Sequence, residues 1–231
     1  MPKVALWALI GSIALLFPIF VFFVKSFQPL YYVLWVVGVG GYVYRNHVAL
    51  EQRFQSWNIG PFKKFLLLGI GAILTEEIFA STSMHLMRYV TTGNFSTYFY
   101  DILQFWALNL LTLPGLIIGW YFLLRRYAYT KKEIFILAGL FGLYAEKIYQ
   151  HIILYPTIAW LLIVPTVFTY GVIVSIPALS IDHTKGKESH GIIRYALAFI
   201  IPFICIMPFI AIALYIKANH PELFPPAGFF M

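Results

Sequence analysis

Residues 64–88 decide the fold class, and they read KFLLLGIGAILTEEIFASTSMHLMR. A helix of about 20 apolar residues crosses the hydrocarbon core of a bilayer, and this stretch is long enough to do so. It nevertheless carries two adjacent carboxyl groups, those of Glu76 and Glu77, near its middle. Because an ionisable side chain at that depth is costly, it is a candidate for function. The segment therefore predicts both a transmembrane helix and the centre of a site.

The composition of the whole chain is that of an integral membrane protein. Of its 231 residues, 61% are hydrophobic and 11% are charged, whereas about 25% of the residues in a soluble domain are charged. So few polar side chains cannot cover the surface of a soluble globule. The single cysteine, Cys205, excludes an intramolecular disulfide and a CxxC zinc site.

Seven apolar segments are long enough to span a bilayer as helices, so the fold class is all-α and polytopic, with residues 1–231 forming a single transmembrane domain. The segments are roughly 4–24, 29–45, 64–88, 99–124, 133–155, 157–180 and 193–216. The first has no small-residue cleavage site after it, and we interpret it as a retained helix rather than a signal peptide. Only Tyr155-Pro156 separates the fifth segment from the sixth, so a count of six stays open.

The distribution of basic residues predicts the orientation. With a cytoplasmic N-terminus, twelve of the sixteen lysines and arginines fall on the cytoplasmic side, and only Lys25, Arg88 and Lys217 fall outside. Cytoplasmic loops of membrane proteins carry such an excess. We therefore expect a multi-pass protein of the cell membrane with its C-terminus outside. The bases are scattered through short loops near lipid, which argues against binding of nucleic acid.

Two further patterns concern the organisation of the chain. Residues 47–62 place Leu50, Phe54 and Trp57 at helical spacing, which predicts an interfacial amphipathic helix, with an ordinary polar loop as the alternative. The third segment also aligns with the fifth at an offset of seventy residues, which pairs Glu76 with Glu146. This pairing suggests a tandem duplication of a two-helix unit, spans 3–4 and spans 5–6.

The polar residues within the spans give the candidate site. At 1.5 Å of rise per residue, Glu76 and Glu146 lie near the midplane or just beyond it, toward the outside. The predicted catalytic residues are Glu76, Glu77, Glu146 and His151, and the predicted supporting residues are Ser81, His85, Asp101 and Lys147. We expect these side chains to face one cavity in the outer half of the bilayer. A purely structural role, with a Glu-Lys pair and serine hydrogen bonds joining helices, is the alternative.

Three kinds of chemistry fit carboxyl and imidazole groups in such a cavity. Glu76, Glu146, His85 and His151 have the side chains that bind a divalent metal such as zinc, with Glu77 as a base for metal-bound water. Alternatively, two close carboxyl groups that share one proton form a Brønsted acid, which suits cyclisation or isomerisation of an isoprenoid. The same acids also suit proton-coupled transport.

Short stretches resemble known families of membrane enzymes. Glu76-Glu77 resembles the diglutamate of the CAAX-protease and bacteriocin-processing proteases, in which an arginine stands where this chain has Ser81. Residues 139–147 look somewhat like the glycine-rich Glu-Asn segment of PrsW-type proteases, with Lys147 in place of the asparagine. Lycopene cyclases carry Pro-x-Glu-Glu in membrane helices, and here Leu74 stands at the proline position. These resemblances imply a membrane-embedded enzyme with both glutamates in its site.

The sequence thus favours a membrane-embedded enzyme, of hydrolase or protease type, that acts on a lipid-soluble or membrane-bound substrate. A metal-dependent intramembrane hydrolase is the version that requires zinc or another divalent ion. The alternatives are a small transporter coupled to protons or cations, and a non-catalytic subunit with a protein partner in a membrane complex. Membrane lipid is the expected surrounding in every case.

Overall fold

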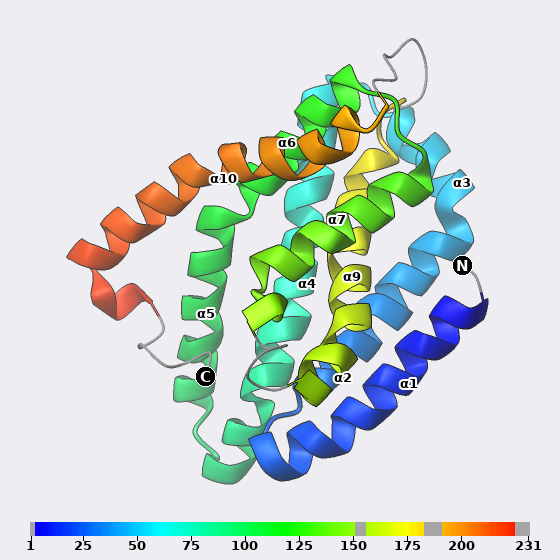
Figure 1. Ribbon diagram of the computed structural model, residues 1–231. Coiled ribbons are helices and arrows are strands. Elements are labelled where there is room, and N and C mark those ends of the chain that lie inside the picture. The colour runs from blue at the N-terminus through cyan, green and yellow to red at the C-terminus, as the bar shows by residue number, and fades with distance from the viewer. Residues whose placement is uncertain (1–2, 151–155, 183–190, 225–231) are drawn as a thin grey trace.

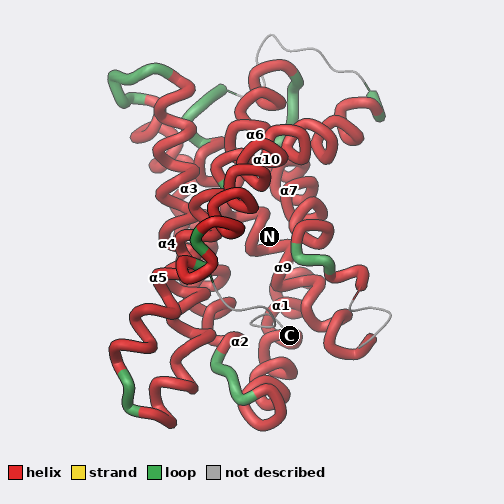
Figure 2. The backbone as a smooth tube through the Cα atoms, turned by 90° about the vertical axis from the view of Figure 1, so that its left-hand side faces the viewer, coloured by secondary structure: helices red, strands yellow, loops and turns green. Residues whose placement is uncertain are grey.

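The computed structural model describes residues 3–150, 156–182 and 191–224, and in these ranges it consists of helices and the loops that join them (Figures 1 and 2). The α-helices are α1 (Lys3–Ile19), α2 (Gln28–Tyr32), α3 (Gly41–Gln55), α4 (Pro61–Thr92), α5 (Phe95–Thr112), α6 (Pro114–Arg126), α7 (Lys131–Ala145), α9 (Pro156–Ala178) and α10 (Ile193–Asn219). Two π-helical stretches, η1 (Phe20–Val24) and η2 (Val33–Gly40), continue α1 and α2, and a 3₁₀ turn, η3 (Pro221–Leu223), follows α10. The all-α prediction is confirmed for the described residues.

Five helical stretches of the described chain are long and apolar enough to cross a membrane. They are Val4–Val24, Pro61–Thr92, Phe95–Arg126, Pro156–Ala178 and Ile193–Asn219. They agree with the first, third, fourth, sixth and seventh predicted segments. The third of them bends at Leu113, where Pro114 begins α6 and cannot donate the backbone hydrogen bond of a continuous helix.

The other two predicted segments are helical but are not among these five candidates. Residues 28–55 form one continuous rod of α2, η2 and α3, and its last part, from Arg45 onward, is polar. Residues 47–55 belong to this rod, so they do not start a separate helix, and their place at the membrane interface stays a prediction. The predicted helix over 133–155 is interrupted, because α7 stops at Ala145 and helical residues resume only at 148–150. Residues 151–155 of this prediction lie outside the described residues.

Helix α7 ends in a turn that the sequence pattern did not reveal. Lys147 adopts the left-handed backbone conformation, with φ at 53°, and its N–H donates to the carbonyl of Tyr144 at 3.1 Å. A left-handed residue of this kind terminates a helix, although glycine is the usual occupant. The side chains of Glu146 and Lys147 therefore do not continue the helical faces of α7. The predicted internal duplication stays untested. Its two glutamates differ in position, since Glu76 lies in the middle of α4 and Glu146 follows the last residue of α7.

Helix α9 lies at the centre of the bundle. It packs against α1, α4, α7 and η2, and over half of its apolar window is buried inside the protein, compared with 17% for α10. Figure 1 shows α10 crossing one end of the bundle and running away from it. Side chains on α9 can therefore contact several helices at once. Most of the surface of α10 is not covered by other helices of the protein.

Close packing of the helices depends on glycines. A Cβ atom on Gly119 of α6 would lie 2.5 Å from the Cα of Pro202 in α10, and one on Gly115 would lie 2.6 Å from the carbonyl oxygen of Cys205. Such small-residue spacing lets two backbones approach closely in a membrane, where burial of apolar surface gives helices little attraction for each other. The Gly115–Gly119 face thus fixes α10 against α6.

The sequence places lysines and arginines close to the connection from α3 to α4 and the connection from α6 to α7. Figure 1 shows these two connections at the same end of the bundle, which is uppermost in the view. There, Arg194 at the start of α10 donates to Glu133 at 2.6 Å and to the carbonyl oxygen of Ala128 at 2.5 Å. Tyr195 donates to the same Glu133 oxygen at 2.5 Å. This network joins α10 to the first turn of α7.

We predict that Gly119→Ala destabilises the protein by about 1–3 kcal/mol, because the added methyl group would overlap the α10 backbone at Pro202. Gly71→Ala is the matched control, since a Cβ there meets nothing within 4 Å. It should change stability by no more than about 1 kcal/mol, in the stabilising direction. Thermal unfolding of the two variants in the same detergent measures the difference, and equal melting temperatures would contradict the packing described.

Candidate functional site

Glu76 and Glu77 lie side by side in the interior of the protein. Both are almost completely buried, with 6% and 4% of their surface exposed, and their carboxyl groups are in hydrogen-bonding contact with each other. They belong to the middle of α4, whose unbroken helix confirms the prediction from residues 64–88. Adjacent residues in a helix point about 100° apart. The pair therefore reaches toward two different sets of neighbours.

Glu76 faces α2 and α9. The hydroxyl of Tyr31, at the end of α2, donates to Glu76 Oε1 and also lies 3.2 Å from Thr169 Oγ1 of α9. Trp35 of η2 donates from Nε1 to the carbonyl oxygen of Thr169 at 3.4 Å. Tyr31, Trp35 and Thr169 are all buried. The carboxyl group of Glu76 is thus held by a tyrosine whose own position is fixed from α9.

Glu77 faces α5. Its carboxyl group is in hydrogen-bonding contact with the side chain of Asn109. The second oxygen, Oε2, is buried and has no hydrogen-bond partner among the described residues. An unsatisfied buried oxygen is rare, because it loses its bonds to water without replacement. Among the described residues, this atom is the unsatisfied part of the pair.

Glu146 forms a second carboxyl centre close to the first. The hydroxyl of Tyr170, on α9, donates to Glu146 Oε1 at 2.6 Å. The ring of Tyr170 lies against Gly142, where an added Cβ would come within 2.3 Å of it. Glu146 is exposed, unlike the α4 pair, yet it is near enough to Glu76 and Glu77 for their charges to interact. The predicted shared site of Glu76 and Glu146 stays a prediction.

Tyr32 lies near both carboxyl centres. Its side chain is buried, is in hydrogen-bonding contact with Thr166 of α9, and is close enough to both Glu76 and Glu146 to interact with their charges. The polar surface around the carboxyl groups therefore comes mainly from α2 and from one stripe of α9. It is rich in tyrosine and threonine and contains no lysine or arginine contact to the α4 pair among the described residues.

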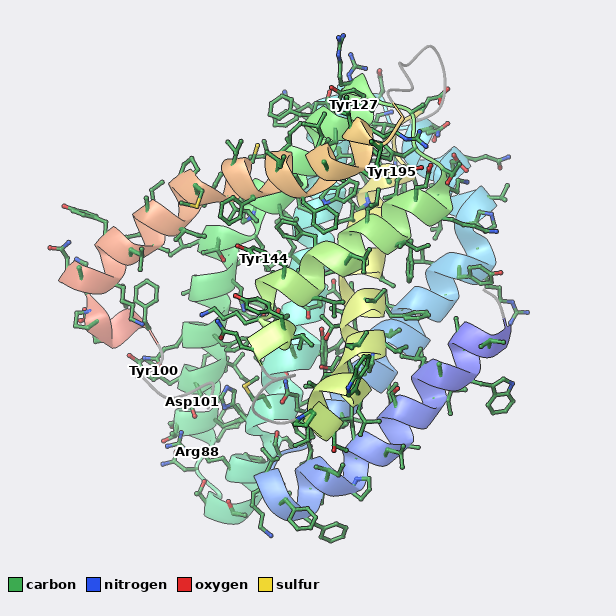
Figure 3. The ribbon with its side chains drawn as sticks, in the orientation of Figure 1. Arg88, Tyr100, Asp101, Tyr127, Tyr144 and Tyr195 are labelled. Carbon is green, nitrogen blue, oxygen red and sulfur yellow. The ribbon has the colours of Figure 1, made fainter. Side chains whose placement is uncertain are left out.

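The histidine and aspartate of the predicted site form a separate cluster. His85 lies eight residues beyond Glu77, which is about 12 Å along a helix. Its Nδ1 is 3.9 Å from Asp101 Oδ2, and the same oxygen accepts from Arg88 Nη1 at 2.8 Å. Figure 3 shows Arg88 and Asp101 close together where α4 and α5 approach their connection. Asp101 is therefore neutralised by Arg88 instead of joining the glutamates.

The remaining predicted residues differ in their surroundings. Ser81 is fully buried, but its hydroxyl donates to the backbone carbonyl of Glu77 and not to a carboxyl group. Lys147 is exposed in the turn after α7. His151 lies outside the described residues. Of the eight predicted positions, the structure places Glu76 and Glu77 in contact, Ser81 one turn further along α4, and Glu146 within electrostatic range of the pair.

The predicted metal site is not formed by the described residues. No three histidine, cysteine, aspartate or glutamate side chains in those ranges are placed to hold one ion. His85 is drawn to Asp101, which removes it from the set expected with Glu76 and Glu146. A catalytic zinc normally has three protein ligands. His151, the fourth residue of the predicted set, lies outside the described residues.

The sequence interpretation missed the residues that surround the glutamates. These are Tyr31, Tyr32, Thr166, Thr169 and Tyr170. A signal was present in α9, where Thr166, Thr169 and Tyr170 follow the i, i+3, i+4 spacing of one helical face. No local pattern indicated that Tyr31 and Tyr32 would face α4.

Comparison with protein-family models, with curated proteins and with solved structures gave no significant match. The resemblances to diglutamate membrane enzymes therefore rest on the residues of the motifs themselves.

We predict that Tyr31→Phe lowers stability by about 1–3 kcal/mol, because it removes the hydroxyl that donates to Glu76 and leaves a buried carboxyl group with one partner fewer. Tyr42→Phe is the control, since the Tyr42 side chain is 61% exposed on α3. Thermal unfolding in detergent compares the two. A Tyr31→Phe protein as stable as Tyr42→Phe would show that the Tyr31 hydroxyl does not support the buried pair.

Proposed function

We propose that this protein is a membrane-embedded enzyme that transfers a proton to a lipid-soluble substrate, with Glu76 and Glu77 as the acid. The observation that carries the proposal is the contact between two buried carboxyl groups, one of which has a free oxygen. Two carboxylates in contact in apolar surroundings repel each other strongly, so the pair retains one proton between them. A proton that the pair retains could be donated from the Glu77 oxygen that has no hydrogen-bond partner among the described residues.

The surroundings of the pair fit this role. Tyr31 holds Glu76 from one side, and Asn109 contacts Glu77 from the other, so the two carboxyl groups have different partners. Because their partners differ, the two carboxyl groups differ in acidity. One group can then donate its proton while the other keeps its hydrogen bonds. Tyr31, Tyr32 and Trp35 add electron-rich ring faces, which attract positive charge. Such faces would stabilise the cation that protonation of a carbon–carbon double bond creates.

The proposed setting is the cell membrane. We infer that the rods 28–55 and α7 also traverse the bilayer, which gives seven crossings with the N-terminus in the cytoplasm and the C-terminus outside. The gathering of lysine and arginine at the α3–α4 and α6–α7 connections supports this orientation, because cytoplasmic loops are enriched in them. The buried pair then lies near the middle of the membrane, where an apolar substrate dissolves.

A proton-coupled carrier is the second candidate. The observation that favours it is the difference between the buried pair and the exposed Glu146, which are close enough to interact electrostatically. Carboxyl groups at two levels of exposure suit a proton that enters at one group and is held at the other. Protein in liposomes would then carry protons under a pH gradient, and Glu76→Gln would stop this flux.

The enzyme proposal is tested by following hydrogen from water into lipid. Purified protein, mixed with a membrane lipid extract in D₂O, should introduce deuterium into a carbon–hydrogen position of a lipid, detected by mass spectrometry. Glu77→Gln should lower this incorporation by about 10²–10⁴-fold, the usual contribution of a positioned acid.

Glu51→Gln is the control, because Glu51 pairs with Lys131 in an exposed ion pair far along the chain from the site. It should incorporate deuterium at the wild-type rate. A parallel reaction in H₂¹⁸O tests the hydrolase version, which would introduce ¹⁸O into a lipid or peptide product. Incorporation of ¹⁸O without deuterium, or no incorporation of either isotope, would contradict the proton-transfer proposal.

A further inference from the structure

An apolar hollow of about 450 Å³ lies beside the second carboxyl centre. It is lined by Leu140, Leu143, Tyr144, Ile148, Tyr149 and Ile163. Its size is within the range of about 300–1,000 Å³ that is usual for ligand sites. The lining is aliphatic apart from two tyrosines, so its chemistry suits hydrocarbon and not a charged or sugar-like molecule.

The hollow is open at the side of the bundle. Tyr144 and Tyr149 are 53% and 48% exposed, and their rings stack with their centroids 6.1 Å apart. Tyr144 also meets Phe203 of α10 edge-on at 6.0 Å. Figure 3 shows Tyr144 on the part of α7 that lies toward α10. Two exposed tyrosine rings thus line the hollow, and Phe203 packs beside one of them.

The hollow and the polar site lie along the same face of α9. Ile163, Thr166 and Tyr170 stand at i, i+3 and i+7, which places them on one face of the helix over about 10 Å. Ile163 lines the hollow, Thr166 contacts Tyr32, and Tyr170 donates to Glu146. In the turn that ends α7, Glu146 stands in the chain between Tyr144 and Ile148, which both line the hollow. A chain bound in the hollow would therefore lie beside the turn that carries Glu146.

We infer that this hollow binds the hydrocarbon chain of the substrate, which reaches the carboxyl site sideways from the bilayer. The inference rests on the proposed function and adds the substrate class, a lipid with a long apolar chain. The occupant is a hydrocarbon because the lining formed by the described residues is apolar, and because α9, which contributes Ile163, is long and apolar enough to cross a membrane. Contact with Leu143 and Ile163 would hold the hydrocarbon chain in the hollow. The reactive end of the substrate would then lie near Tyr170 and Glu146.

The test uses the whole protein and a long-chain hydrocarbon that carries a diazirine in the middle of its chain. After illumination, peptide mapping by mass spectrometry should find the label on residues 140–149 and on Ile163, and unlabelled hydrocarbon should compete with it. Ile212 and Leu214 on α10 are 51% and 62% exposed and report ordinary contact with lipid. Labelling of the hollow that does not exceed labelling of Ile212 and Leu214, or that resists competition, would overturn the inference.

Variants that fill the hollow give an independent check. Leu143→Trp and Ile163→Trp should reduce labelling of the hollow to the level on α10, whereas Ile212→Trp, on an exposed face, should leave it unchanged. Ile163→Ala enlarges the hollow and should preserve labelling. It shows whether a substitution at this position is tolerated when it does not fill the hollow. Unchanged labelling in both tryptophan variants would overturn the inference.

The labelling experiment tests the hydrocarbon site, and the deuterium experiment tests the proposed reaction, so each hypothesis can be refuted without the other. Glu77→Gln lies in the acid pair and not in the hollow, so it should label as wild type while losing deuterium incorporation. Labelling that persists without any deuterium incorporation by wild type would refute the proposed reaction but keep the hydrocarbon site. Deuterium incorporation without saturable labelling would refute the hydrocarbon site alone.

Discussion

The cost of placing the Glu76 and Glu77 carboxyl groups inside an apolar bundle is the constraint on which the arrangement of the helices depends. An unpaired charge in such surroundings costs several kcal/mol, and even a neutral carboxyl group needs hydrogen bonds. The neighbours of α4 supply them from three elements: Tyr31 at the end of α2, Asn109 on α5, and Thr169 on α9 through Tyr31. Each contact requires a particular rotation of its helix. The glutamates thus determine how α2, α5 and α9 face α4.

Glycines make these rotations compatible with close packing. Apolar side chains gain little by leaving lipid for the protein interior, so helices in a membrane associate through tight van der Waals contact. A Cβ on Gly69 of α4 would lie 2.4 Å from the side chain of Ile117, and one on Gly142 of α7 would lie 2.3 Å from the ring of Tyr170. The second contact has a chemical consequence, because it allows Tyr170 to lie flat on α7 and reach Glu146 just past the helix end.

Much of the fold followed from the sequence, because apolar length and the position of charges are local properties. Residues 64–88 predicted α4, and the burial of Glu76 and Glu77 agrees with their expected role. The end of α7 could not be predicted in this way, since Lys147 adopts a left-handed conformation that no glycine announced. The separation of His85 from the glutamates also escaped prediction. It depends on Arg88 and Asp101 meeting across two helices, which the spacing within one helix does not reveal.

The two carboxyl centres together account for a complete proton cycle in the proposed reaction. An acid that protonates a double bond becomes a base, and a rearranged product forms only when a proton leaves the cation again. The buried pair and Glu146 could divide these steps, since the pair keeps a proton through mutual repulsion whereas Glu146 is exposed and receives one hydrogen bond from Tyr170. Tyr32 is close enough to both centres to interact with their charges. Such a cycle leaves the net composition of the substrate unchanged and requires no metal ligand set, which is consistent with a site built from carboxyl, hydroxyl and amide groups.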